Sequence, residues 1–192
     1  MRIEDTIFSV TFSEKTMINE ATHFPNSNVR VAAHTLIEKG SVLFSNVVVM
    51  GACQIGKDCR IGNFSLIRDN VIFGDNVKIG SHNSIEPFAR IGSRSRTQGH
   101  CMVSEYSTIG EDVFLGPYFN NPADRNPGKP RPEGEYTPEA AIIKDGARIG
   151  SHVVVMPGQV VEEETLIGAG SAITKSTGKN QVWFGNPARQ IK

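Results

Sequence analysis

The stretch that decides the fold runs from Gln54 to Gly80 and reads Gln54-Ile-Gly-Lys-Asp-Cys-Arg-Ile-Gly-Asn-Phe-Ser-Leu-Ile-Arg-Asp-Asn-Val-Ile-Phe-Gly-Asp-Asn-Val-Lys-Ile-Gly80. Every sixth residue in it is large and apolar: Ile55, Ile61, Ile67, Phe73 and Ile79. The same spacing extends from Val31 to Leu115, and only Thr97 among these fifteen positions departs from it. A helix repeats every 3.6 residues and a strand every 2, so neither alone explains a period of six.

A period of six predicts a short strand and a tight turn repeated along the chain, which is a parallel β-helix. Each hexad would form one side of a triangular prism, with the large residue inward and a smaller one four places later. Those smaller residues include Ser41, Val47, Cys53, Cys59, Ser65, Val71, Val77, Ala89, Cys101 and Val113. Three hexads close a coil, and coils stack at about 4.8 Å. We therefore expect an all-β fold with one continuous core.

The register breaks after Leu115 and resumes at Ile143, which leaves 22 residues more than one hexad needs. Residues 116–138 hold six of the ten prolines, so neither a further coil of the prism nor a helix is expected there. We predict one hexapeptide-repeat domain over 29–192, with about seven triangular coils, a long loop over 116–142 and a C-terminal tail over 178–192. A loop of this length without regular structure is expected to be functional.

Residues 1–28 do not follow the repeat, and we expect an N-terminal capping segment there because solenoids need an atypical end piece. Phe8, Val10 and Phe12 alternate with polar residues, which predicts a short strand.

Charge and composition limit the function classes. Twenty basic residues balance twenty acidic ones, so no surface for nucleic acid is expected. There is no apolar run of membrane-spanning length and no basic-then-apolar leader, so we expect a cytoplasmic protein without membrane insertion. Cys53, Cys59 and Cys101 all occupy the small inward position, where we expect buried free thiols.

The histidines occupy a special slot. His34, His82, His100 and His152 each fall three residues after an inward residue. The same slot also holds Gly40, Asn46, Asp58, Asn70, Asn76, Asp112, Gly146 and Gly158. This composition predicts corners with positive φ, so each histidine has a structural explanation.

Two of these histidines are also functional candidates. His82 and His100 are 18 residues apart and therefore stack on one edge of the prism, followed by Tyr118 at the start of the expected loop. A proton acceptor beneath a loop suits acid–base catalysis, and we predict His100 as the general base, with His82 beside it as a substrate-binding residue.

Four sequence segments point to a known family. They are Ile167-Gly-Ala-Gly-Ser-Ala-Ile-Thr-Lys175, Val182-Trp-Phe-Gly-Asn-Pro-Ala-Arg-Gln-Ile191, Val113-Phe-Leu-Gly-Pro117 and Asn120-Asn-Pro122. With them, residues 30–192 resemble the left-handed β-helix hexapeptide acyltransferases, and most of all the nucleotide-sugar N-acetyltransferases of bacterial surface-polysaccharide (lipopolysaccharide) synthesis. The resemblance implies a left-handed winding, a homotrimer with its active site between two prisms, acetyl-CoA as co-substrate and no metal.

The resemblance also implies roles for individual residues. Pantetheine would lie near Ala169 and Gly170 beside the Pro187 segment, with Lys175, Lys179 and Arg189 as candidates for the CoA phosphates. Tyr118, Asn120, Asn121 and Arg125 are the candidates for binding a sugar or nucleotide-sugar acceptor. Related sugar O-acetyltransferases usually carry a histidine in the similar loop. This loop has none, which favours His100 or no protein base at all.

The expected reaction is direct attack of an acceptor amine on the thioester, with a backbone N–H holding the oxyanion. Three alternatives remain open at this point. They are sugar O-acetylation on the same fold, a metal hydratase of the γ-carbonic anhydrase type, which needs three converging histidines, and a non-catalytic β-helix scaffold.

Overall fold

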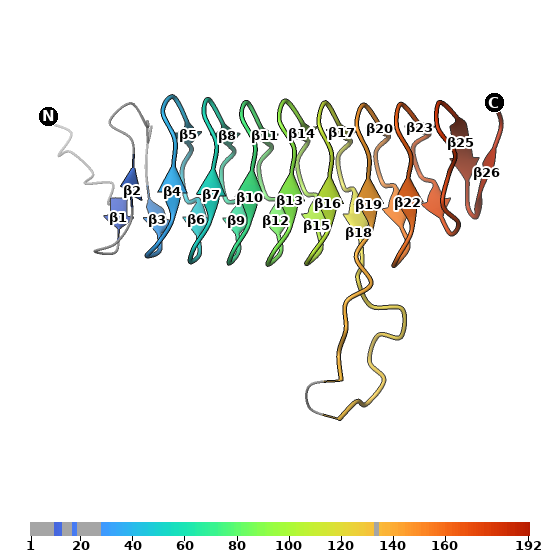
Figure 1. Ribbon diagram of the computed structural model, residues 1–192, viewed down its shortest axis with the longest axis horizontal. Helices are drawn as coiled ribbons and strands as arrows, with labels where there is room; N and C mark the ends of the chain where they lie inside the picture. The colour runs from blue at the N-terminus through green and yellow to red at the C-terminus, as the bar shows by residue number, and fades with distance from the viewer. Residues whose placement is uncertain (1–9, 13–16, 19–27, 133–134) are drawn as a thin grey trace, which may run out of the picture.

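The computed structural model describes residues 10–12, 17–18, 28–132 and 135–192. Within these residues every regular element is a short strand, and the strands stack into a three-sided solenoid whose first and last coils lie at opposite ends (Figure 1). The predicted left-handed parallel β-helix is confirmed. The described coils number about eight rather than the predicted seven.

Each side of the prism is one parallel sheet, counted here over the described residues. Sheet A has nine strands: β1 (Val10–Phe12), β3 (Val29–Val31), β6 (Val48–Val49), β9 (Leu66–Ile67), β12 (Ser84–Ile85), β15 (Met102–Val103), β18 (Asn120–Asn121), β21 (Val154–Val155) and β24 (Ala172–Ile173). Sheet B has eight: β2 (Met17–Ile18), β4 (Leu36–Ile37), β7 (Gln54–Ile55), β10 (Ile72–Phe73), β13 (Arg90–Ile91), β16 (Thr108–Ile109), β19 (Ile142–Ile143) and β22 (Val160–Val161).

Sheet C has nine strands and includes the C-terminal hairpin: β5 (Val42–Leu43), β8 (Arg60–Ile61), β11 (Lys78–Ile79), β14 (Arg96–Thr97), β17 (Phe114–Leu115), β20 (Arg148–Ile149), β23 (Leu166–Ile167), β25 (Val182–Gly185) and β26 (Ala188–Gln190). β25 and β26 pair antiparallel and end the sheet. No helix in the described part of the chain is long and apolar enough to cross a membrane.

The hexad explains the core. Strand partners are 18 residues apart, as in the pair Ile67 and Ile85, so inward residues of successive coils lie directly over one another. Both side chains are fully buried, and the same is true along all three sheets. The predicted thiols Cys53, Cys59 and Cys101 are free and buried in this core. Each single coil buries little apolar surface, so stability arises from stacking.

Corners between the sheets carry positive φ, as predicted. His34, His82, His100 and His152 have φ of 62°, 58°, 59° and 55°. All eight Gly, Asn and Asp residues named above share this left-handed conformation. The residue after the inward one is often glycine for a different reason: a Cβ on Gly116 would lie 2.6 Å from the carbonyl carbon of Gly150 on the next coil.

Thr97, the polar exception in the inward row, has a structural partner. Its hydroxyl accepts hydrogen bonds from the Asn83 side-chain amide at 2.9 Å and from the Gly80 N–H at 3.2 Å. Asn83 is itself buried, and its Oδ1 accepts the Cys101 N–H at 2.6 Å. The departure from the repeat is therefore a satisfied polar pair inside the prism.

The predicted start of the loop at residue 116 is wrong by one hexad. β18 continues sheet A with the register Met102 to Asn120 and Val103 to Asn121. The repeat is hidden in the sequence because the inward residue is Asn121, which is polar yet fully buried. Its Oδ1 accepts the Ser104 N–H at 3.1 Å, and its Nδ2 donates to the Ser107 hydroxyl at 2.7 Å. The inserted loop therefore begins at Pro122.

At the N-terminus, β1 pairs parallel with β3, and β2 pairs parallel with β4. These strands extend sheets A and B by one rung, and the predicted strand around Val10 and Phe12 is present. Phe8 and most of the capping segment 1–28 lie outside the described residues.

Candidate functional site

The edge between sheets C and A carries a column of stacked rings, which we call the ring ladder: Phe64, His82, His100, Tyr118 and His152. Successive ring centroids lie 5.0, 4.9, 4.9 and 4.6 Å apart, and the two histidine planes differ by 1°. The prediction that His82 and His100 stack on one edge with Tyr118 next to them is confirmed.

The left-handed corner explains why these rings align. Each ladder residue has φ between 55° and 60°, so its side chain leaves the prism in the same direction one coil apart. All five are exposed. The sequence pattern identified His152 as a corner residue only. In the fold, the chain returns to the prism after the loop, so that His152 follows Tyr118 on the next coil of the same edge. Phe64 was missed because aromatic residues rarely adopt positive φ.

His100 is held by stacking rather than by hydrogen bonds. Among residues 28–132 and 135–192, neither nitrogen of its ring has a hydrogen-bond partner, while His82 and Tyr118 cover its two faces. The ring nitrogens therefore point outward at the edge, available to a group bound beside the prism. This is the arrangement that a general base needs before its substrate arrives.

The inserted loop does not leave from the ladder, which corrects the sequence-based expectation. Tyr118 belongs to a regular corner, and the loop begins four residues later, at the edge between sheets A and B (Figure 1). That edge carries another ring pair, Phe88 and Tyr106, with centroids 4.7 Å apart. The ladder and the loop thus flank sheet A on opposite sides within one chain.

The described part of the loop has its own anchors. Arg125 forms a bidentate ion pair with Glu139, with Nη2 to Oε2 at 2.7 Å, and Nη2 also donates to the Pro157 carbonyl at 2.9 Å. This contact raises the pKa of Arg125 and lowers that of Glu139. Arg131 pairs with Asp124 at 2.6 Å. The predicted acceptor ligand Arg125 is therefore already committed to holding the base of the loop.

A second contact ties the loop back to the prism. The Tyr136 hydroxyl donates to Glu105, which lies beside the Phe88–Tyr106 edge. Burial and this carboxylate raise the pKa of Tyr136 to about 12. The Arg131 guanidinium lies 5.3 Å from the centre of the Tyr136 ring. Through these contacts the loop projects from the prism as a shaped element (Figure 1).

The two adjacent asparagines have opposite placements. Asn121 is fully buried, so the structure does not support a direct contact between its side chain and an acceptor. Asn120 faces outward from sheet A, two residues after the ladder residue Tyr118. Its Oδ1 is shielded from water and has no hydrogen-bond partner in the described chain. An unpaired buried acceptor is costly, so a ligand or a second copy that donates a hydrogen bond there would be favoured.

The residues assigned to CoA lie on three different edges of the prism. Ala169 and Gly170 lie at the end of the ladder edge, and the Gly185 N–H donates to the Ser171 hydroxyl at 3.0 Å, which places the hairpin with Pro187 and Arg189 beside them. Lys175 follows sheet A on the next edge. Lys179 lies on the third edge and pairs with Glu163 at 3.2 Å. One chain therefore does not bring both lysines to Gly170.

A shallow groove of about 270 Å³ lies on the late coils of sheet C. Most of its surface is apolar, from residues that include Phe114, Leu166 and Ala169, and Arg148 also lines it. Because it ends beside Gly170 on the ladder edge, an apolar chain in it would run along the prism axis toward Tyr118. The groove could take the apolar part of a pantetheine arm.

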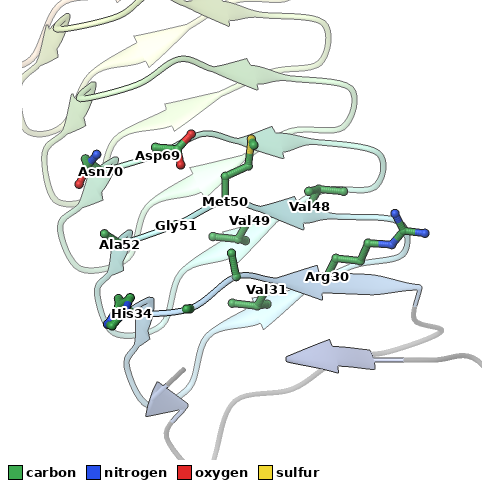
Figure 2. Close-up of a pocket in the computed structure, with 12 residues that line it drawn as sticks. Arg30, Val31, His34, Val48, Val49, Met50, Gly51, Ala52, Asp69 and Asn70 are labelled. Carbon is green, nitrogen blue, oxygen red and sulfur yellow. The ribbon is translucent and has the colours of Figure 1, made fainter. Parts of the chain in front are cut away.

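A larger hollow of about 670 Å³ lies on the first coils (Figure 2). Val31, Val49 and Met50 give it an apolar floor, with His34 and Asn70 at its rim. It opens at the edge between sheets A and B, away from the ladder. No proton donor and acceptor face each other in it, so it has no evident catalytic arrangement.

Comparisons with known proteins agree with this fold. Residues 34–69 match the family model described as bacterial transferase hexapeptide (six repeats). The match covers part of the prism, and the same hexad continues through the other described coils. It is similar to the solved structure of the polySia-specific acetyltransferase NeuO, with a TM-score of 0.56, 22% identity, and coverage of 96% of this chain and 86% of that one. At this identity the likeness concerns the fold.

Two curated relatives are also similar. The bifunctional protein GlmU of Heliobacterium modesticaldum is 33% identical over 135 residues, 70% of this hexapeptide-repeat chain and 27% of GlmU. The galactoside O-acetyltransferase of Escherichia coli is 35% identical over 94 residues, 47% of this chain and 46% of that enzyme. The chain thus spans less than half the length of these relatives.

Proposed function

We propose that this hexapeptide-repeat protein transfers an acetyl group from acetyl-CoA to an amino group of a sugar, in particular a nucleotide-linked sugar. The observation that carries the proposal is the ring ladder, which exposes the unbonded nitrogens of His100 on the edge that borders, at later coils, a groove suited to pantetheine. The acetyltransferase among the curated relatives supports the donor chemistry, and the galactoside acceptor in its name supports a sugar.

The separation of ladder and loop supports a site formed by more than one copy of the chain. Within one chain, sheet A lies between them, so the loop base at Arg125 cannot approach His100 of the same prism. In a homotrimer, the loop of one copy would reach the ladder edge of the next. The unpaired Asn120 oxygen on sheet A is then a contact for the neighbouring loop or for the acceptor.

The reaction follows from this placement. The acceptor amine attacks the thioester carbonyl, a C–N bond forms, and the C–S bond breaks. His100 takes the proton from the attacking nitrogen and returns it to the departing CoA sulfur. A backbone N–H of the coil beside the ladder holds the oxyanion. His82 and Tyr118 keep the His100 ring plane fixed by stacking.

The test is acetyl-CoA-dependent thiol release, measured across amino-sugar nucleotides, free amino sugars and galactosides. Asn is the appropriate replacement for His100, because Asn46 holds the same left-handed conformation in the same column. We expect His100→Asn to lower kcat by about 100-fold, the typical contribution of a general base. The matched control His34→Asn changes an equivalent corner on another edge and should leave kcat unchanged.

Two results would contradict the proposal. Full turnover in His100→Asn would show that His100 is not the general base. Absence of any acetyl-CoA-dependent transfer across the panel would show that the protein is not an acetyltransferase for these acceptors. Galactosides are included in the panel to test O-acetylation, because the relative named galactoside O-acetyltransferase is 35% identical over its matched segment. Preference for a hydroxyl acceptor over every amine would replace the N-acetylation proposal with that one.

A further inference from the structure

The outer face of sheet C carries a row of cations, of which only Arg148 also lines the groove assigned to pantetheine. Arg60, Lys78 and Arg96 occupy the outward position on three successive strands, and Arg148 follows after Phe114. We call these four cations the basic row. All four side chains are exposed. With rungs about 4.8 Å apart, the row is roughly 19 Å long.

Neighbours in the row have the same charge. At other places, charged residues one coil apart have opposite signs and pair, as in Arg68 with Glu86 at 3.1 Å and Lys144 with Glu162 at 2.8 Å. Like charges directly opposite on adjacent strands destabilise a sheet. A chain with zero net charge has acidic residues available for pairing, yet none is placed in the row.

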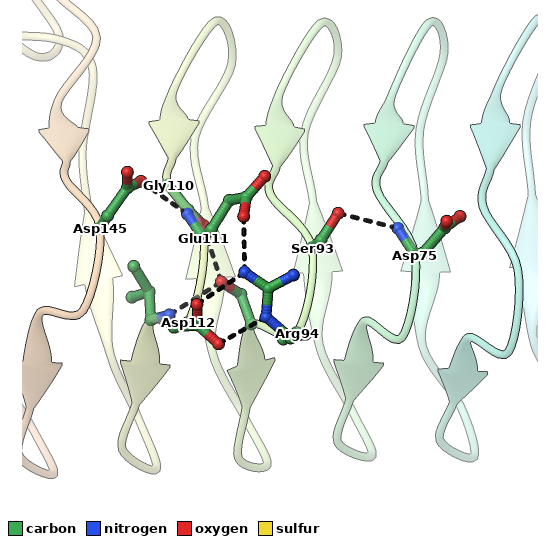
Figure 3. Close-up of polar contacts among 9 residues, drawn as sticks. Asp75, Ser93, Arg94, Gly110, Glu111, Asp112 and Asp145 are labelled. Atoms are coloured by element: carbon green, nitrogen blue, oxygen red, sulfur yellow. Dashed lines mark hydrogen bonds and ion pairs between the residues drawn. The ribbon is translucent and has the colours of Figure 1, made fainter.

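Neighbouring acids are engaged elsewhere. At the edge between sheets B and C, Arg94 binds Asp112 at 2.7 Å and Glu111 at 2.6 Å, so both carboxylates are neutralised by a residue outside the row (Figure 3). In the described part of the chain, no carboxylate forms an ion pair with Arg60, Lys78, Arg96 or Arg148. The positive charge of the row therefore faces solvent.

Three residues of the row, Lys78, Arg96 and Arg148, also line a hollow of about 790 Å³ together with Phe114. Arg94 and its partner Asp112 border the hollow at the edge of the sheet. Arg96 lies over the Phe114 ring, 5.1 Å from its centre, which fixes the guanidinium at the cavity wall. The lining carries four cations and one carboxylate, and that carboxylate is paired with Arg94, so the hollow has the excess positive charge that an anion-binding site needs.

We propose that the basic row binds a linear acidic glycan, whose carboxylates lie along successive rungs of sheet C. The length of the row favours a chain with repeated charges over a single diphosphate, which would cover about one rung. The aromatic ring that lines the hollow is Phe114, and Arg96 already lies over it, which disfavours single-stranded nucleic acid because that is usually held by base stacking. The identification of the glycan as acceptor rests on the proposed function, but binding to the row does not.

Calorimetric titration without acetyl-CoA tests the proposal, with oligogalacturonates of two, four and eight sugars as probes. Affinity should rise from disaccharide to octasaccharide and fall steeply with added salt. Arg96→Gln should weaken octasaccharide binding by about tenfold, because it removes one charge-assisted contact. Arg90→Gln is the matched control, since Arg90 has the same outward, exposed position on sheet B. It should leave the affinity unchanged.

Stability provides a second readout. Since the row repels itself, Arg96→Gln should leave the melting temperature unchanged or raise it, so lost binding would not reflect unfolding. Affinity independent of glycan length, equal weakening in Arg90→Gln, or tighter binding of a DNA strand of matched charge would overturn the proposal. Glycan binding without acetyl transfer would contradict only the proposed function, and acetyl transfer without glycan binding would contradict only the basic row.

Discussion

Replacement of Asn121 separates a structural role from a substrate-binding one. The side chain is fully buried and makes two hydrogen bonds, to the Ser104 N–H at 3.1 Å and to the Ser107 hydroxyl at 2.7 Å. Each contributes about 1 kcal/mol, and Asn121→Ala also leaves a void and an unpaired buried N–H. We expect a total cost of about 2–4 kcal/mol.

A second substitution at this site should be milder. Val103 and Val155 occupy the corresponding inward positions on β15 and β21, so Asn121→Val restores the hexad and fills the space. Burial of the valine contributes about 1.5 kcal/mol, which offsets most of the lost hydrogen bonding. With about 2–4 °C per kcal/mol for a protein of this size, the alanine variant should melt about 4–16 °C lower.

Thermal unfolding followed by circular dichroism measures both variants, and hydrogen exchange at the Ser104 amide reports the bond directly. Protection of that amide should fall in both variants while neighbouring coils keep theirs. The reasoning would be refuted if Asn121→Val melted as low as Asn121→Ala. It would also be refuted if either variant kept its stability and Ser104 protection but lost acetyl transfer, because Asn121 would then act on a substrate.

Three further predictions concern the cysteines and the loop. Burial raises the pKa of Cys101 to about 11, so at pH 8 roughly one thiol in a thousand is ionised, and a thiol reagent should label the native protein only slowly and the unfolded protein at once. The pKa of Tyr136 is raised to about 12, so the docking contact with Glu105 is complete below pH 10 and is lost as pH rises through 12. Ultraviolet titration should show one late tyrosine that is absent from Tyr136→Phe. Arg125→Gln should speed cleavage of the loop by proteinase K without changing the melting of the prism, and equal cleavage rates would contradict the anchoring role.

Sequence periodicity predicted the prism because one physical requirement repeats. Inward residues such as Ile67 and Ile85 must be apolar to stack, and corners such as Asn46 and His100 must tolerate positive φ. Both requirements are local in the sequence and are read directly from it. The three sheets and their one-coil register then follow from the period alone.

The exceptions arise where a long-range hydrogen bond replaces apolar packing. Asn121 satisfies its amide with Ser104 and Ser107, so a buried hexad looks polar and the loop appears to begin too early. Thr97 is paired with Asn83 in the same way. Such pairs depend on which side chains the fold brings together, which the period does not reveal.

The candidate site was partly predictable for the same reason. The stacking of His82 on His100 follows from their 18-residue spacing. The position of the loop depends on the hexad that ends at Asn121, which the sequence pattern does not reveal. The sequence therefore predicted a loop over the ladder, whereas the loop leaves from the next edge of the prism. The division of Lys175 and Lys179 between two edges also follows only from the completed coil count.

The most direct test of the account is the location of the acetyl donor on the prism. Hydrogen exchange followed by mass spectrometry, with and without saturating acetyl-CoA, reports this for every coil. We expect slower exchange at 98–100 and 116–118 on the ladder edge and at 166–170 beside the sheet C groove. Unchanged exchange at these segments, with protection confined to sheet B or to the first coils, would contradict it.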